Sequence, residues 1–382
     1  MNIDIIGCGS IGCALVRLIA TYLSNTQIRV FDINIANLSE LSYFSNVEIV
    51  YNNNYSSLTF NNTVICCASW EATKNIVKCI CLQDNNIENC KTFISICRPN
   101  NDDLEDLTKI IADNQIEFIF AYGLEPGLTE ILSYYLLNKV DSVHTLNIEC
   151  GGLVLPKPNN LLGYKRLFGS SYLPFAQKSC FCIRNGKLIT VPRFSEIKVH
   201  EEPDIGIVET WHDGMQIRLS TNPKLIKSNV NVDQRTIRWS GYANIVNLLQ
   251  KAGMLDELPL NIDKNYSAKK LLESLSYESF TFKPAYEKSI TILNFELTGL
   301  KDRDKINIKL KIKFFDLTPC INSMALATCL PILFLLLKNN HMLHGIIYPE
   351  HLFTQDNIKV LFEYMQIFGV KISEQTNVIN YN

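Results

Sequence analysis

Close to the N-terminus the sequence reads Asn2-Ile3-Asp4-Ile5-Ile6-Gly7-Cys8-Gly9-Ser10-Ile11-Gly12. The apolar run before Gly7 has the length of a strand, and from Ser10 apolar residues recur every three or four positions, as on a helix that lies on a sheet. Glycines between the two allow a tight turn close to a ligand, because a Cβ would block the approach. A second apolar run, Ile28–Phe31, leads to Asp32, twenty residues after Gly12.

This order of strand, glycine turn, helix, strand and acid predicts a dinucleotide site. Free N–H groups at the helix start bind the pyrophosphate, and the acid accepts hydrogen bonds from the adenosine ribose. Asp32 favours NAD over NADP, because a carboxylate repels the 2′-phosphate of NADP and no arginine occurs at positions 33–37. The predicted cofactor-binding residues follow the strands of this unit: Gly7, Gly9, Ser10, Ile11, Gly12, Asp32, Ile33, Ala68, Ser69, Ser95 and Cys97.

Strand and helix patterns continue to alternate after Asp32, which predicts an α/β fold with an N-terminal doubly wound parallel sheet of about six strands. The expected strands are Val47–Val50, Thr63–Ala68, Phe93–Cys97 and Phe118–Ala121. The expected helices are Glu71–Leu82 and Asp102–Asn114.

The pattern changes at the turn Gly123–Gly127, after which Leu128–Leu137 reads as a helix. Ile306–Phe314 then alternates apolar residues with lysines and asparagine, as a half-exposed antiparallel strand does, and Ile290–Leu297 is its expected partner. We therefore predict a second α+β domain with a largely antiparallel sheet. The predicted domains are 1–125, joined by C-terminal helices in 319–382, and 126–318. The last helices are expected at Met324–Leu337, interrupted by Pro331, and at Ile358–Phe368.

Composition narrows the class of protein. The formal net charge of the 382 residues is −2, without a basic run, so neither nucleic acid nor an anionic membrane surface is an expected partner. The longest apolar run, Ala325–Leu337, is too short to span a bilayer, and we expect a cytoplasmic protein. The thirteen cysteines include CxC pairs but no zinc-type spacing, so buried reduced thiols are expected, with no metal.

Several motifs in order resemble the saccharopine dehydrogenase family, and within it the lysine 6-dehydrogenase and saccharopine reductase branches. The Gly123–Gly127 segment GLEPG is similar to the family's GLDPG turn, and GGL followed by LGYK at 162–165 resembles its GGLP…LGYK stretch. Thr236–Tyr242 resembles TLRWPGW, and NSMA at 322–325 with the segment 345–349 resembles the C-terminal region.

The resemblance implies NAD-dependent hydride transfer between a nicotinamide and the amine-bearing carbon of an amino acid such as L-lysine or saccharopine. The cofactor carries this chemistry, while the protein orients the carbon and moves protons. The resemblance also implies that the C-terminal helices return to the nucleotide domain. It further implies that the middle domain carries the substrate contacts and the interface of a homodimer or dimer of dimers.

Charged residues in these motifs are candidates for the substrate site. Lys165 and Arg238 are candidates for binding a substrate carboxylate, for which the arginine fork is suited, and Arg98 is a further candidate. Glu125 follows the last parallel strand. It is either the proton acceptor or the group that binds the substrate ammonium, or else a carboxylate that caps the next helix. His212 is a catalytic candidate because histidine titrates near neutral pH, although its position beside Asp213-Gly214 also suits a structural role.

Two classes of function remain open. The first is the NAD-dependent amino acid oxidoreductase. The second is a catalytically inactive NAD-binding protein with a regulatory or scaffold role. The sequence has Arg98 and Glu125 where the family has other residues, and these positions lie where proton transfer is expected.

Overall fold

The computed structural model describes residues 1–34, 38–51, 55, 58–82, 90–112, 114–169, 174–175, 179–215, 217–261, 263–338 and 344–378. The chain forms two compact units. The first unit contains Met1–Tyr134 and Ala325–Met365, and the second contains Tyr135–Met324 and the residues from Gln366 onward. Within the described ranges, no helix is long and apolar enough to cross a bilayer.

The first unit is built on a seven-stranded parallel sheet with the order β15-β6-β5-β4-β1-β2-β3. Its strands are β1 (Asn2–Ile6), β2 (Gln27–Phe31), β3 (Val47–Val50), β4 (Thr63–Cys66), β5 (Thr92–Ser95), β6 (Glu117–Ile119) and β15 (Gly345–Ile347). The predicted doubly wound parallel sheet is confirmed. The seventh strand, β15, comes from the C-terminal part of the chain and pairs with β6, and no pattern in the first 125 residues announces it.

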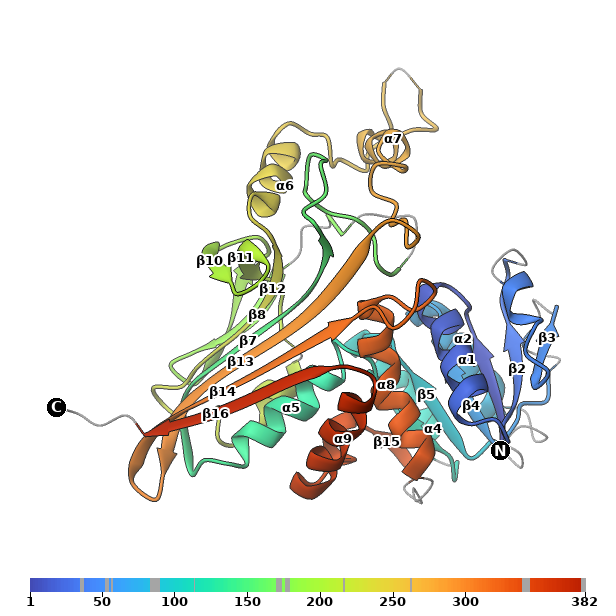
Figure 1. Ribbon diagram of the computed structural model, residues 1–382, viewed down its shortest axis with the longest axis horizontal. Coiled ribbons are helices and arrows are strands. Elements are labelled where there is room, and N and C mark those ends of the chain that lie inside the picture. The colour runs from blue at the N-terminus through green and yellow to red at the C-terminus, as the bar shows by residue number, and fades with distance from the viewer. Residues whose placement is uncertain are drawn as a thin grey trace. The chain divides into compact units, whose positions relative to one another are not determined.

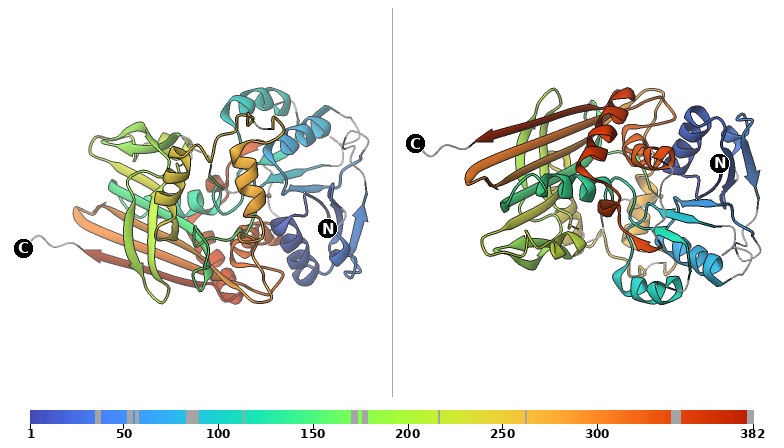
Figure 2. Two further views of the ribbon diagram at one scale, coloured as in Figure 1. Left: turned by 90° about the horizontal axis from the view of Figure 1, so that it is seen from above. Right: turned by 90° about the horizontal axis from the view of Figure 1, so that it is seen from below.

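The winding of this sheet places helices on both of its faces. The helices of the unit are α1 (Ser10–Tyr22), α2 (Trp70–Leu82), α4 (Asn101–Ile111), α5 (Leu128–Leu137), α8 (Ser323–Lys338) and α9 (Gln355–Ile367). The chain leaves β1 toward β2 and β3, then returns to β4 and continues the opposite way. Right-handed crossovers therefore put α1 on one face and α2 and α4 on the other, as Figure 2 shows. The direction reverses between β1 and β4, where ligands bind in such sheets.

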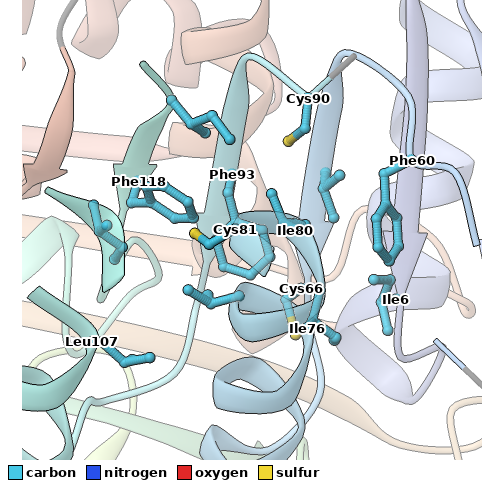
Figure 3. Packing of buried hydrophobic residues seen from close by; sticks show 14 of the residues in the cluster. Ile6, Phe60, Cys66, Ile76, Ile80, Cys81, Cys90, Phe93, Leu107 and Phe118 are labelled. Carbon is cyan, nitrogen blue, oxygen red and sulfur yellow. The ribbon is translucent and has the colours of Figure 1, made fainter. Parts of the chain in front are cut away.

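The core on the α2 face is aromatic and sulfur-rich. Figure 3 shows Ile76 and Ile80 of α2 directed toward the sheet residues Phe93 and Phe118. The rings of Phe93 and Phe118 have centroids 5.8 Å apart, and all four side chains are fully buried. Cys66 and Cys81 fill the spaces between them as small apolar groups. This dense packing keeps the carboxyl ends of the strands, where ligands bind in such sheets, in fixed positions.

Helix α8 is apolar on all sides, and from Ala325 to Ile332 nearly every side chain is fully buried. The predicted interruption at Pro331 is wrong, because one helix runs through it. Proline removes a single N–H from the ladder, and dense packing around the helix offsets that loss. The carbonyl of Pro331 also accepts a hydrogen bond of 3.1 Å from the Tyr122 hydroxyl.

The second unit contains a nine-stranded sheet whose main path runs β10-β11-β12-β7-β13-β14-β16, with β8 and β9 attached to β12. Its strands are β7 (Ser142–Leu155), β8 (Ser179–Arg184), β9 (Lys187–Pro192), β10 (Lys198–Glu202), β11 (Gly206–His212), β12 (Asn231–Trp239), β13 (Lys288–Lys301), β14 (Asp304–Phe315) and β16 (Lys371–Val378), and its helices are α6 (Tyr242–Lys251) and α7 (Ala268–Leu275). The sheet is antiparallel except for β7 with β12, which confirms the predicted largely antiparallel sheet.

The hairpin of β13 and β14 follows the predicted alternation. Ile306, Ile308, Leu310, Ile312 and Phe314 are all buried, and the side chains between them are exposed or half-buried. The hairpin turns at Asp302 and Arg303, which both have positive φ. Figure 1 shows β13, β14 and β16 side by side in orange and red.

The division of the chain differs from the predicted one at both ends. The first boundary falls inside α5, after Tyr134, and the second unit continues to Met324. The C-terminal residues 371–378 form β16 on the outer edge of β14 instead of joining the first unit. Hydrogen bonding explains this placement, because β14 has an edge that a strand can pair with, from Ile306 to Lys313.

Two glycines in the turn between β1 and α1 offer a test of how tightly this turn is packed. A Cβ on Gly12 would lie 1.9 Å from the Gly7 carbonyl oxygen, whereas a Cβ on Gly9 would have no atom within 4 Å. We expect Gly12→Ala to lower the free energy of unfolding by about 1–3 kcal/mol through overpacking. Gly9→Val should cost less than about 1 kcal/mol, the loss of a favourable N-cap residue. Urea denaturation of both variants measures the difference, and equal losses would contradict this packing.

Candidate active site

The glycine turn brings α1 into contact with the end of β1. Gly7 has a φ of +89°, and its N–H donates to the Phe31 carbonyl at 2.8 Å. A Cβ on Gly7 would lie 2.8 Å from the Ala68 nitrogen. Gly12 packs on the Gly7 carbonyl from the helix side. Both positions therefore require glycine for the fold itself, before any ligand is considered.

Gly9 differs, because its own surroundings leave room for a side chain. It is the N-cap residue of α1, no side chain caps this helix end, and the first turn contains no acidic residue. Ser10 and Ile11 begin the helix beside it. Open space in front of uncapped N–H groups suits a phosphate, which the positive end of the helix dipole attracts. The turn thus fits the pyrophosphate of a dinucleotide.

Asp32 stands directly after β2, beside the same turn. One of its carboxylate oxygens accepts a short hydrogen bond from the Cys8 N–H, and the other accepts one of 2.7 Å from the Asn34 N–H. The neighbouring Ile33 is exposed. This position matches the acid that binds a ribose hydroxyl in dinucleotide-binding turns. The bond to Cys8 also ties the glycine turn to the end of β2.

The ends of β4 and β5 supply the remaining predicted cofactor residues. Ser69 caps α2 through a hydrogen bond of 3.3 Å from the Ala72 N–H. The Cys97 thiol donates to the Ala68 carbonyl at 2.6 Å, and the Ser95 hydroxyl accepts from the Cys97 N–H at 3.3 Å. The structure therefore joins Ala68, Ser95 and Cys97 in one hydrogen-bonded group at the carboxyl edge of the sheet.

Arg98 and Glu125 follow β5 and β6 and form an ion pair. The Arg98 guanidinium lies 3.8 Å from a Glu125 carboxylate oxygen, and both side chains are partly exposed. Their separation is at the upper limit of an ion pair, so each retains hydrogen-bonding capacity for a third group. The two residues predicted for different roles thus lie together at the carboxyl edge of the sheet.

Glu130 is a site residue that the sequence analysis missed. It lies in the first turn of α5, and one carboxylate oxygen accepts from the Gly127 N–H at 2.6 Å and from the Thr129 hydroxyl at 2.9 Å. The other oxygen is buried and has no hydrogen-bond partner in the described residues. Burial raises the pKa of Glu130 to about 7, and the charge of Glu125 adds to this effect while Arg98 opposes it. The signal was the spacing of Gly127 and Glu130, which is that of a helix capping box.

In the second unit, Arg238 lies among aromatic side chains. Its guanidinium stands over the Tyr164 ring, 5.3 Å from the centroid, and one nitrogen donates to the Ile237 carbonyl at 2.8 Å. Tyr164 makes an edge contact with Tyr242 at 5.6 Å, and Tyr242 stacks on Trp211 at 5.1 Å. These rings belong to one buried cluster, to which strand β11 contributes Trp211, helix α6 contributes Tyr242 and the segment after β7 contributes Tyr164.

Three donors of this region have no partner in the part of the chain that the structure describes: the Arg238 Nε, the Tyr242 hydroxyl and the Trp211 Nε1. Arg238 is 8% exposed, and Tyr242 and Trp211 are each 1% exposed. We call these residues the donor cluster. A buried unsatisfied donor costs about 1–3 kcal/mol, and an anion such as a carboxylate would satisfy several at once. Tyr164 and Tyr242 lie in motifs already noted, but only their packing reveals the cluster.

Lys165 and His212 are placed differently from Arg238. Lys165 forms an ion pair of 2.5 Å with Glu287 and donates to the Thr281 carbonyl at 3.2 Å. His212 is fully buried on the opposite face of the sheet, since it pairs with Arg235 while Trp211 pairs with Thr236.

The surroundings of His212 are charged. Its Nε2 donates to Glu196 at 2.9 Å, and this hydrogen bond lowers the pKa of Glu196. Its Nδ1 lies 3.5 Å from Asp233. These contacts place His212 in a network of charged side chains that stabilises the fold. The structure does not bring His212 to the donor cluster, and among the described residues no group of three or more metal-binding side chains occurs.

A family model described as the saccharopine dehydrogenase C-terminal domain matches residues 123–370. The chain belongs to the saccharopine dehydrogenase family. Among solved structures, the apo saccharopine dehydrogenase (L-Glu forming) of Saccharomyces cerevisiae is similar, with a TM-score of 0.80 at 16% identity over 99% of this chain and 100% of that chain. At this identity the likeness shows the fold, which extends over 99% of the chain, whereas the family model covers residues 123–370.

Other solved structures are more distant. Gal80p of Saccharomyces cerevisiae reaches a TM-score of 0.41 at 8% identity and covers 97% of each chain. The scyllo-inositol dehydrogenase of Lactobacillus casei, solved with NAD(H), reaches 0.31 at 14% identity over 39% of this chain and 45% of that chain. Both likenesses are too low to bear on this member of the saccharopine dehydrogenase family.

The buried carboxyl group of Glu130 gives a pH-dependent contribution to stability. Its pKa is raised from 4.5 to about 7 in the folded state, so the folded protein binds more protons than the unfolded chain between these values. The free energy of unfolding therefore falls as the pH rises through this range, by up to about 3 kcal/mol. Glu130→Gln keeps an acceptor for the Gly127 N–H and removes the charge. We expect the variant to lose less stability than the wild type between pH 5 and pH 8, as measured by urea denaturation.

Glu117 provides the matched control, because burial also raises its pKa to about 7 but it lies at the opposite end of β6. Glu117→Gln should reduce the same pH dependence without affecting the Gly127 turn. An unchanged pH dependence in Glu130→Gln would contradict the raised pKa.

Proposed function

We propose that the protein is an NAD-dependent amino acid oxidoreductase that transfers hydride between the nicotinamide and the amine-bearing carbon of its substrate. Family membership and the glycine turn support the dinucleotide. The donor cluster is the main support for an amino acid as the substrate. Its guanidinium, phenol and indole groups each carry a buried donor without a partner among the described residues, and a carboxylate is the kind of group that such donors bind.

In this proposal the nicotinamide, when bound, accepts or supplies the hydride at the substrate carbon. The N–H groups at Gly9, Ser10 and Ile11 hold the pyrophosphate, and Asp32 accepts from the adenosine ribose. Ala68, Ser69, Ser95 and Cys97 line the carboxyl ends of the strands next to it. Binding the substrate through a carboxylate far from the reacting carbon orients one C–H bond for hydride transfer. This lowers the entropy that must be lost in the transition state.

Proton movement is assigned to Glu125. A substrate ammonium must lose a proton before its carbon gives up hydride, and a partly exposed carboxylate can accept it. The Arg98 guanidinium lies 3.8 Å away and is the ion-pair partner that orients the Glu125 carboxylate. Lys165 is paired with Glu287, so its contribution to carboxylate binding is smaller than that of Arg238.

L-Lysine and saccharopine are both retained as substrates of this proposal. A panel of amino acids and of N-substituted amino acids, each assayed with NAD and NADP in both directions, tests it through the absorbance of the reduced nicotinamide. Dinucleotide binding without turnover of any amine or imine would favour the second candidate, a catalytically inactive NAD-binding regulatory or scaffold protein. The replacement residues Arg98 and Glu125 are the observation that keeps this candidate open.

The cofactor preference follows from Asp32. We expect tighter binding of NADH than of NADPH, and we expect Asp32→Ser to narrow the difference because it removes the charge that repels the 2′-phosphate. Gly9→Val should abolish binding of both, since its side chain would occupy the space assigned to the pyrophosphate. Fluorescence titration measures these affinities. A wild-type preference for NADPH, or normal affinity in Gly9→Val, would refute the assignment.

The donor cluster predicts graded losses. Arg238→Ala should lower kcat/KM about tenfold to a hundredfold, because a charge-assisted hydrogen bond contributes roughly 1.5–3 kcal/mol. Arg238→Lys keeps the charge but not the fork and should lose less. Tyr242→Phe removes only the hydroxyl and should lose up to about tenfold. NADH affinity should remain unchanged in all three. Wild-type kcat/KM in Arg238→Ala would place the carboxylate elsewhere.

We also propose that the protein assembles as a homodimer or dimer of dimers through the second unit. Strand β16 supports this, since it is an edge strand of the nine-stranded sheet with mostly exposed side chains. Light scattering at micromolar concentration should give at least twice the mass of one chain, 43.5 kDa. A monomer under these conditions would contradict the assembly but not the enzymatic proposal.

A further inference from the structure

Two cysteines occupy the glycine turn. Cys8 stands between Gly7 and Gly9, and Cys13 lies in the first turn of α1, which begins at Ser10. The Cys13 sulfur lies 3.0 Å from the Cys8 carbonyl oxygen, to which its thiol donates. Cys8 is fully buried and Cys13 is half-buried. The side chain of Cys13 thus folds back onto the turn, toward the residue that carries the other thiol.

The two thiols are unequal. The neighbouring Cys13 thiol, together with burial, raises the pKa of Cys8, whereas the Cys8 thiol lowers the pKa of Cys13 although burial opposes this. The Arg17 side chain, one helical turn further, also lowers the pKa of Cys13. A thiolate is the nucleophilic form of cysteine, and positions at helix N-termini favour it. Cys13 is therefore the reactive member, and Cys8 holds the proton beside it.

Other cysteines near this turn do not share these properties. Burial raises the pKa values of Cys67, Cys97 and Cys329, which keeps them as unreactive thiols. Cys320 is exposed, but it belongs to the second unit.

We propose that Cys8 and Cys13 form a reversible disulfide, produced by hydrogen peroxide, that closes the glycine turn to the dinucleotide. The Cys13 thiolate attacks the peroxide, its S–O bond forms as the O–O bond breaks, and hydroxide leaves. The Cys8 sulfur then attacks the sulfenic sulfur, so that the S–S bond forms as the S–O bond breaks, and the departing hydroxide leaves as water with the Cys8 proton. The hydroxide of the first step becomes the other water with the proton that Cys13 lost when it ionised. Two thiols are oxidised, and one peroxide is reduced to two water molecules.

The linkage would act on the groups that bind the pyrophosphate. The Cys8 N–H donates a hydrogen bond to Asp32, and the Cys8 carbonyl accepts one from the Cys13 thiol. The backbone of Cys8 is therefore bonded both to the acid and to the first turn of α1. A disulfide requires its own Cβ separation and dihedral, and it removes the thiol hydrogen. It also encloses Gly9 in a short covalent ring, at the position where open space would receive the phosphates. We expect the oxidised protein to bind NADH at least tenfold more weakly.

This inference rests on the dinucleotide part of the proposed function, and the experiment separates the two. The background variant is Cys320→Ser, which removes the exposed thiol. After hydrogen peroxide treatment, peptide mass spectrometry should show a linkage between Cys8 and Cys13, and fluorescence titration should show at least tenfold weaker NADH binding that dithiothreitol restores. In the same background, Cys13→Ser and Cys8→Ser should each give equal NADH affinities before and after peroxide.

Binding and oxidation must also be coupled in the reverse direction. In a redox buffer of reduced and oxidised dithiothreitol, saturating NADH should raise the ratio of oxidised to reduced dithiothreitol at which half of the protein is disulfide-bonded. The increase should equal the factor by which oxidation weakens NADH binding. Reduced protein that binds neither NADH nor NADPH would refute the cofactor assignment. Three results would overturn the disulfide inference and leave the cofactor assignment intact, provided that the reduced protein binds NADH normally. They are the absence of a Cys8–Cys13 linkage after peroxide, an unchanged NADH affinity once the linkage has formed, and a loss of NADH affinity in peroxide-treated Cys13→Ser as large as in the background variant.

Discussion

The contact between Gly12 and the Gly7 carbonyl sets the geometry of the first unit. Because no Cβ intervenes, α1 lies against the turn that leads into it, and the helix begins directly in front of β1. The same turn is tied to β2 by Gly7 and by the bond between Cys8 and Asp32. This close backbone contact thus places the N–H groups at the start of α1, the acid and the two thiols together. The open space at Gly9 is a consequence of this packing.

The two faces of the sheet in the second unit carry different kinds of side chain. On the face of His212, charges neutralise one another at short range. Glu202 shows the balance: burial would raise its pKa, but hydrogen bonds from Lys311 and Lys313 lower it. The face of Arg238 instead carries aromatic rings and donors that have no partner among the described residues. A bound carboxylate would satisfy such donors, and for this reason we assign substrate binding to this face.

At the carboxyl edge of the parallel sheet, two carboxyl groups have different surroundings. Glu125 is partly exposed and lies 3.8 Å from the Arg98 guanidinium. Glu130 is buried, and its raised pKa favours the protonated form near neutral pH. Glu130 also binds the Gly127 N–H and so fixes the turn that carries Glu125. The assignment of proton transfer to Glu125 therefore depends on a neighbour that stabilises its position.

Local sequence determined the parallel sheet, the glycine turn, the β13–β14 hairpin and the position of Asp32. Each of these rests on short-range periodicity or on a steric demand for glycine, which neighbouring residues express by themselves. The family resemblance, carried by ordered motifs, indicated the class of chemistry. Pro331 shows the limit of local rules, because only the packing around α8 keeps that helix continuous. Strand β15, strand β16 and the donor cluster came from the tertiary structure alone. Their partners are distant in the chain, and pairing between distant segments leaves no periodic signal in either one.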